Sequence, residues 1–130
     1  MYIFLLYLVI CHHVCGTDLF VKDPSSSIRM LVLADWGGNE IAPYTTPSQR
    51  YTSEAMGIIG EQLDINTVLA LGDNFYHTGI NGTCESERFD QTWNNVYVAP
   101  SLMVPWLVNA GNHDHVGNVS AQIAYTHISN

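Results

Sequence analysis

Apolar residues along this chain gather in short uninterrupted runs, separated by longer segments in which they recur at helical spacing. Three such runs predict buried strands, and each ends in a polar turn that contains glycine. They are residues 28–34 (IRMLVLA), 67–71 (TVLAL) and 104–110 (VPWLVNA). Pro105 lies near the start of the third run, where a missing N–H is tolerated.

The segments between these strands predict helices. Thr46 is placed to cap a helix with Pro47 in its first turn. The apolar face expected for this helix comprises Tyr51, Ala55, Ile58, Ile59 and Leu63. A second helix, ended by Pro100, is predicted by Phe89, Trp93, Val96 and Tyr97, and residues 119–127 begin a third.

The resulting order is β-α-β-α-β, which predicts an α/β fold. Parallel strands joined by right-handed helical crossovers are the usual solution for this order. All three strands then end at one edge of the sheet, where such sheets bind their ligands.

The N-terminus carries a different signal. Residues 2–10 (YIFLLYLVI) are uniformly apolar but shorter than the about 20 residues that span a bilayer. The run fits the core of a secretory signal peptide, although it lacks an early Lys or Arg, and a buried N-terminal strand is the alternative. We therefore expect a signal peptide at 1–16, a polar leader at 17–27 and a folded domain at 28–130. The product would be secreted or lysosomal, with no membrane anchor in the mature chain.

The sequons at Asn81 and Asn118 are candidate glycosylation sites in such a product. Cleavage after residue 16 would remove two of the three cysteines and leave Cys84, as a free thiol or with a partner elsewhere.

The composition of the chain excludes several classes of partner and of protein. Four Lys and Arg face twelve Asp and Glu, for a net charge of −8 over 130 residues. This balance argues against nucleic acid or anionic lipid as the main partner, because both require cations to neutralise phosphate. An apolar fraction of 47% excludes a disordered acidic tail. The length fits one domain, and the six histidines leave metal chemistry open.

Polar residues suited to metal binding follow each predicted strand. Asp35 follows the first and Asp73 the second, Asn112 and His113 follow the third, and Tyr76 can turn back toward Asp73. Carboxylate, amide, imidazole and phenolate together suit iron, zinc or manganese, and a carboxylate that bridges two metals is typical of phosphate-ester hydrolysis. The alternative is a polar rim of turn and helix caps.

Neighbouring residues carry weaker signals. His115 and His127 are expected at the surface or just behind the site residues, and Asp114 either orients a neighbouring histidine or caps its turn. The sequence contains no phosphate-binding loop, no dinucleotide-binding fingerprint, no nucleophile elbow and no cysteine pair with zinc-ribbon spacing.

Three motifs in order then identify a family resemblance. Residues 35–38 (DWGG), 72–79 (GDNFYHTG) and 111–115 (GNHDH) resemble the metallophosphoesterase superfamily, and Tyr76 makes the set similar to the purple acid phosphatases within it. The resemblance runs from about Arg29 to the last residue. It implies that residues 28–130 are the N-terminal part of a calcineurin-like metallophosphoesterase domain, one half of a two-sheet sandwich flanked by helices.

The resemblance also implies roles. Asp35 and Tyr76 would bind a ferric ion, Asp73 would bridge two metals, and Asn112 would bind the second ion. His113 would contact the substrate phosphate and protonate the leaving group. The implied cofactor is a binuclear centre of Fe(III) with Fe(II) or Zn(II). The implied substrate is a phosphomonoester or phosphoprotein, hydrolysed at acidic pH. Oligomeric state stays open.

Two departures from the family pattern qualify this expectation. Ala34 replaces a usual glycine, and the family's later Val-x-x-His and Gly-His-x-His stretches do not occur in these residues. We therefore expect an N-terminal fragment of an acid phosphatase that is inactive alone. The alternatives are a related enzyme acting on diesters or nucleotides, and a non-catalytic secreted binding fragment.

Overall fold

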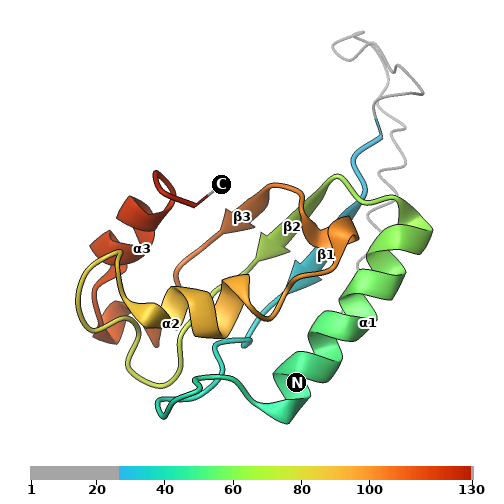
Figure 1. The fold of residues 1–130 in the computed structure, drawn as a ribbon. Helices are drawn as coiled ribbons and strands as arrows, with labels where there is room; N and C mark the ends of the chain where they lie inside the picture. The colour runs from blue at the N-terminus through green and yellow to red at the C-terminus, as the bar shows by residue number, and fades with distance from the viewer. Residues whose placement is uncertain (1–26, 130) are drawn as a thin grey trace, which may run out of the picture.

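The computed structural model of the chain describes residues 27–129 (Figure 1). The signal peptide predicted at 1–16, and the leader up to residue 26, lie outside the described residues. The α/β prediction is confirmed, in the expected order of strands and helices. The elements are β1 (Met30–Leu33), α1 (Pro47–Leu63), β2 (Thr67–Ala70), α2 (Glu87–Phe89), which continues as a π-helical turn (Asp90–Asn94), a 3-10 turn (Pro100–Leu102), β3 (Trp106–Val108), a second 3-10 turn (Asp114–Val116) and α3 (Val119–Tyr125).

The three strands form one parallel sheet in the order β1-β2-β3. Leu31 of β1 pairs with Val68 of β2, which pairs with Trp106 of β3. The carboxyl ends of all three strands therefore meet at one edge, as the sequence predicts, and Figure 1 shows the three arrows pointing the same way.

Helix α1 begins where the sequence places it. The Thr46 hydroxyl accepts a hydrogen bond from the Gln49 N–H (3.1 Å), which satisfies one of the free donors of the first turn. The helix ends at Asp64, whose left-handed backbone (φ 49°) lets its N–H return to the carbonyls of Gly60 and Glu61.

The predicted buried face of α1 is confirmed only in part: Ile59 and Leu63 pack against the main core, but two other members of that face are exposed. Tyr51 and Ile58 are 70% and 59% exposed. The buried positions are mostly small or polar: Gln49, Thr52, Ser53, Met56, Gly57 and Gly60. Ser53, Gly57 and Gly60 among them face residues 96–101, which approach so closely that a Cβ on Gly57 would lie 2.6 Å from the Cβ of Ala99. Hydrogen bonds across this contact, such as Ser101 Oγ to the Gly57 carbonyl (2.6 Å), replace apolar packing.

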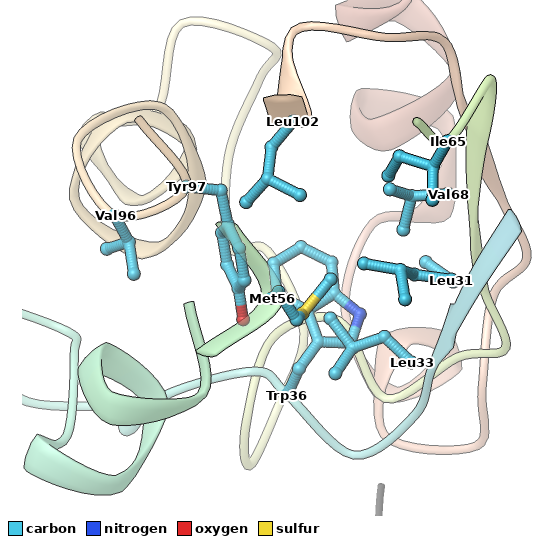
Figure 2. Packing of buried hydrophobic residues seen from close by; sticks show 10 residues of the cluster. Leu31, Leu33, Trp36, Met56, Ile65, Val68, Val96, Tyr97 and Leu102 are labelled. Atoms are coloured by element: carbon cyan, nitrogen blue, oxygen red, sulfur yellow. The ribbon is translucent and has the colours of Figure 1, made fainter. Parts of the chain in front are cut away.

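The main core lies between one face of the sheet and the layer formed by α1 and residues 93–104. Leu31, Leu33 and Val68 from the sheet pack against Met56 of α1 and against Tyr97 and Leu102, with the Trp36 ring among them (Figure 2). By the alternation of the strands, Leu107 points to the opposite face, and it is 57% exposed. Among residues 27–129, the sheet thus has one covered face and one face with exposed apolar side chains.

The second predicted helix is shorter than its periodicity suggests, because only α2 and the π-helical turn form. This segment and α3 enclose a smaller apolar cluster of Phe75, Ile80, Phe89 and Ala121. The rings of Phe89 and Tyr125 stack at 3.9 Å between centroids. Within residues 27–129, the helices are all too short or too polar to cross a bilayer.

Candidate metal centre

Three of the predicted site residues meet at the carboxyl edge of the sheet. The Tyr76 hydroxyl donates to Oδ1 of Asp35 at 2.5 Å, and Oδ2 of Asp73 lies 3.3 Å from the same oxygen. The expected return of Tyr76 toward Asp73 is therefore present, and Asp35 joins the pair. Two carboxylates and one phenol form an oxygen-rich donor set, which fits a hard metal ion such as ferric iron.

The backbone at both aspartates is unusual. Asp35 has φ 56° and Asp73 has φ 52°, in the left-handed region that L-residues with side chains adopt rarely. Asp tolerates this region better than most residues, but the conformation still costs free energy and is concentrated at functional sites. The two turns follow β1 and β2 directly, so the strand ends deliver both carboxylates to the cluster.

His113 lies beside this cluster. Its N–H donates to Oδ1 of Asp73 (3.1 Å), and its ring centroid is 4.8 Å from that of Tyr76. Its Nδ1 lies 2.7 Å from the His77 carbonyl oxygen. Because a carbonyl only accepts, Nδ1 carries a hydrogen in this contact, and Nε2 is the nitrogen left to act on a substrate.

Asn112 is exposed in the turn between Gly111 and His113. Its side-chain amide makes no hydrogen bond to any other residue that the structure describes. The structure therefore places Asn112 next to the cluster in sequence but does not bring its side chain into the Asp35–Asp73–Tyr76 contacts. Likewise, within the described chain no three His, Cys, Asp or Glu side chains are grouped as a metal site.

The environment of Tyr76 affects its protonation. Burial, followed by the hydrogen bond and the negative charge from Asp35, raises the pKa of the Tyr76 hydroxyl above its ordinary value. The phenol is therefore held protonated between the two carboxylates. A phenolate ligand must lose this proton, so a cation that bound to Tyr76 would release it.

A buried polar network lies directly behind the cluster. Asn74 is fully buried, and its Oδ1 accepts from the Trp36 indole N–H (2.9 Å). Its Nδ2 donates to the Asn109 carbonyl (2.8 Å) and to Oε1 of Gln122 (3.2 Å). One side chain thus connects the segments after all three strands and helix α3.

Asp114 completes this network. It is fully buried and accepts from the N–H groups of Asn74, Phe75 and Gly111, at distances between 2.8 and 3.2 Å, and from Nε2 of Gln122 (3.0 Å). The carboxylate thus joins the β2 and β3 turns. The expectation that it orients a histidine or merely caps its own turn is too narrow.

Two glycines allow these loops to approach each other. A Cβ on Gly37 would lie 2.5 Å from the Tyr76 nitrogen, and a Cβ on Gly111 would collide with the Asp73 carboxylate. Only glycine therefore permits the present distances, in accordance with its use at close backbone contacts.

The remaining predicted positions lie at the surface. Asn81 and Asn118 are exposed, and Asn118 also caps α3 through the Ala121 N–H (3.3 Å). Their glycosylation stays a prediction. His115 and His127 are exposed, as expected. Cys84 is half-buried and has no disulfide partner among residues 27–129.

Sequence reasoning missed three residues around the site. These are Asn74 and Gln122, which belong to the buried polar network, and His77, whose carbonyl accepts from His113. Asn74 and His77 lie inside the second motif, residues 72–79, and this position is the only sequence signal for them. Nothing in the sequence marks Gln122, because it reaches the network only when α3 packs against the loops that follow the strands.

Comparison with known proteins agrees with this geometry. Residues 28–129 match the family described as Calcineurin-like phosphoesterase. The chain therefore belongs to the calcineurin-like phosphoesterase family.

Within this family the chain is similar to named acid phosphatases. It is 45% identical to tartrate-resistant acid phosphatase type 5 of Sus scrofa over 107 residues, which cover 82% of this chain and 31% of the relative. The human protein of the same name is 43% identical over 79% of this chain and 32% of its own length. Purple acid phosphatase 4 of Arabidopsis thaliana is 38% identical over 84% of this chain and 30% of its own length. The chain thus spans about a third of the curated relatives it matches.

One solved structure supports the fold. A Plasmodium protein described as "GAP50 the anchor in the inner membrane complex" superposes with a TM-score of 0.64 and 20% identity, over 75% of this chain and 29% of its own. At this identity the likeness concerns the fold alone.

Proposed function

We propose that this chain contributes the N-terminal part of a binuclear metal-dependent acid phosphatase that hydrolyses phosphate monoesters, including phosphoproteins. The observation that carries the proposal is the convergence of Asp35, Asp73 and Tyr76 on one point, with the Tyr76 hydroxyl 2.5 Å and 3.3 Å from the two carboxylates. The named acid phosphatases among its relatives support the same reaction class.

Each residue has a proposed role in this site. Asp35 and Tyr76 would hold a ferric ion, Asp73 would bridge, and Asn112 would hold a divalent iron or zinc ion. When bound, the two ions would supply a hydrolytic nucleophile and charge stabilisation for the transferred phosphoryl group. These four residues leave the coordination incomplete, so the 130-residue chain is proposed to be inactive alone and to hold metal weakly.

His113 is the proposed acid. The His77 carbonyl engages Nδ1, so the proton that reaches the leaving-group oxygen would come from Nε2. The Asp73 carboxylate accepts from the His113 N–H, which fixes the histidine backbone relative to the bridging position. The proposed acid and the proposed bridging ligand are therefore linked directly.

The cellular location that we propose rests on the predicted signal peptide. A signal peptide at residues 1–16 would direct the protein into the secretory pathway, to a lysosomal or extracellular site. Glycans at Asn81 and Asn118 are compatible with this route because both side chains are exposed.

The test is iron binding followed by absorption spectroscopy on the purified chain. Addition of Fe(III) should produce a visible phenolate-to-iron band, which Tyr76→Phe should abolish. Tyr51→Phe is the matched control, since Tyr51 lies 70% exposed on α1. A band that persists in Tyr76→Phe would contradict the assignment. Iron binding without any band would favour the alternative of a related enzyme for diesters or nucleotides.

A further inference from the structure

Arg88 is a buried cation beside the candidate metal centre. It belongs to α2 and is 7% exposed. Its Nη1 donates to the Gly79 carbonyl (2.8 Å), and its Nη2 donates to the Tyr76 carbonyl (2.7 Å) and the Asn39 carbonyl (3.2 Å). The Gly37 carbonyl lies 3.5 Å from the same Nη2. One planar group thus contacts both the loop after β1 and the loop after β2.

The guanidinium has no carboxylate partner. Over residues 27–129 the one ion pair joins Arg29 and Asp64, at the surface. Arg88 instead lies over the rings of Tyr44 and Phe75, at 5.2 and 5.5 Å from their centroids.

Burial lowers the pKa of Arg88, but a guanidinium stays protonated in proteins. The nearby carboxylates of Glu40 and Asp114 favour its charge, but among the described residues neither forms an ion pair with it. A buried cation without a direct ion pair is costly, which points to a specific role for its contacts.

The bonded carbonyls indicate that role. The Tyr76 N–H donates to the Gly37 carbonyl at 3.0 Å, so the two loops already touch beside the candidate centre. In addition to this direct contact, Arg88 donates hydrogen bonds to the carbonyl of Tyr76 on one loop and to that of Asn39 on the other. The separation of the two loops decides whether the Tyr76 hydroxyl reaches Asp35, because each loop carries one of the two groups.

We propose that Arg88 is a positioning residue that fixes the loop after β2 against the loop after β1, and so holds Tyr76 on Asp35. That this contact positions a metal ligand rests on the proposed function. That Arg88 holds the two loops together does not. Lysine cannot replace Arg88 in this role. Its single ammonium lacks the rigid fork that reaches carbonyls on two loops at once.

The first measurement is amide hydrogen exchange of the metal-free chain, in the wild type and in Arg88→Lys. The reporters are the N–H groups of Asn39, Tyr76 and Gly79, each hydrogen-bonded within or between the two loops. Their exchange should become about tenfold faster in Arg88→Lys, as expected for a lost charge-assisted contact. The N–H groups of β1 and β2 should change far less. Arg50→Lys is the matched control, because Arg50 is exposed on α1 and, within residues 27–129, its guanidinium hydrogen-bonds only to the loop after β1, at the Thr45 hydroxyl (3.0 Å), and does not bridge the two loops.

Two results would overturn the proposal. The first is loop exchange that stays unchanged in Arg88→Lys. The second is exchange that rises equally in the loops and the strands, which would mean that Arg88 stabilises the whole fold and not the loop contact in particular. Arg88→Met removes the charge as well and should exceed the effect of Arg88→Lys. If the Met variant does not fold, the Lys variant decides.

The second measurement separates this proposal from the proposed function. With Fe(III) added, Arg88→Lys should shift the phenolate-to-iron band, because Tyr76 is displaced, while Arg50→Lys leaves the band in place. A wild-type chain that gives no band contradicts the metal assignment but leaves the exchange result valid. A normal band in Arg88→Lys, at unchanged loop exchange, contradicts the positioning role alone.

Discussion

The Tyr76 hydroxyl oxygen lies 2.5 Å from Oδ1 of Asp35, although 41 positions of sequence separate the two residues. Neither residue would reach the other without the parallel pairing of β1 and β2, which brings their carboxyl ends side by side. The sheet therefore creates the site, and the loops adjust it.

Replacement of Asp114 by Asn should destabilise the chain by about 3 kcal/mol, because the amide cannot accept from three buried N–H groups as the carboxylate does. Urea unfolding of the two proteins measures the difference. Asp90→Asn, at an exposed carboxylate, is the control and should lie within about 0.5 kcal/mol of the wild type. Equal effects of the two changes would show that the network behind the cluster is not important for stability.

Gly37→Ala should separate the two loops. The added methyl group would lie 2.5 Å from the Tyr76 nitrogen and 2.6 Å from the Phe75 nitrogen, and backbone cannot yield as a side chain can. We expect a loss of about 1–3 kcal/mol, typical of overpacking, in thermal or urea unfolding.

Gly60→Ala is the comparison for this change. At Gly60 the nearest atoms belong to the side chains of Ser101 and Ile65, at 3.2 Å and beyond. Alanine also favours the helix by about 1 kcal/mol. A larger loss at Gly60 than at Gly37 would contradict the close approach of the two loops.

A matched pair of leucines tests the one-sided core. Leu33→Ala removes a side chain that is 4% exposed and should cost about 2–5 kcal/mol. Leu107→Ala removes the same atoms at a position that is 57% exposed and should cost about 0.5 kcal/mol or less. Chemical unfolding decides between them. A comparable loss at Leu107 would mean that the open face of the sheet is covered in solution.

Stability should fall steeply at alkaline pH through Tyr97. Burial raises the pKa of Tyr97 above its ordinary value near 10, so the folded chain keeps this proton after the unfolded chain has lost it. The free energy of unfolding then decreases as pH rises above about 10, by at most about 1.4 kcal/mol per pH unit from this group.

Tyr97→Phe should flatten that decline without altering the profile near neutral pH. Tyr51→Phe, at an exposed position, should keep the wild-type slope. Unfolding curves at several alkaline pH values provide the measurement. Parallel profiles for wild type and Tyr97→Phe would contradict the buried environment of the hydroxyl.

Much of this architecture could be predicted from the sequence, for identifiable reasons. The strands form apolar runs ended by glycine turns, and Thr46 with Pro47 marks the start of α1. Because parallel strands end at one edge, the meeting of Asp35, Asp73 and Tyr76 also follows from their positions. The strands and the start of α1 depend on local sequence. The meeting of the strand ends depends on the right-handed crossovers between parallel strands.

Other features depend on tertiary contacts that periodicity does not encode. The buried face of α1 carries Ser53, Gly57 and Gly60 rather than Ile58, because backbone at residues 96–101 approaches too closely for large side chains. Arg88 likewise looks like an ordinary charged helix residue until the loops that it binds are in place.

The order of residues within each strand-end motif has one more consequence. Asp35, Asp73 and His113 at the cluster are each followed directly by a residue of the buried network: Trp36, Asn74 and Asp114. One inserted residue between the members of any such pair would pull either the reactive group or its support out of place. Spacing is therefore as constrained as composition in these three motifs, whereas the exposed turn at residues 81–83 has no such restriction and is where the chain can tolerate added length.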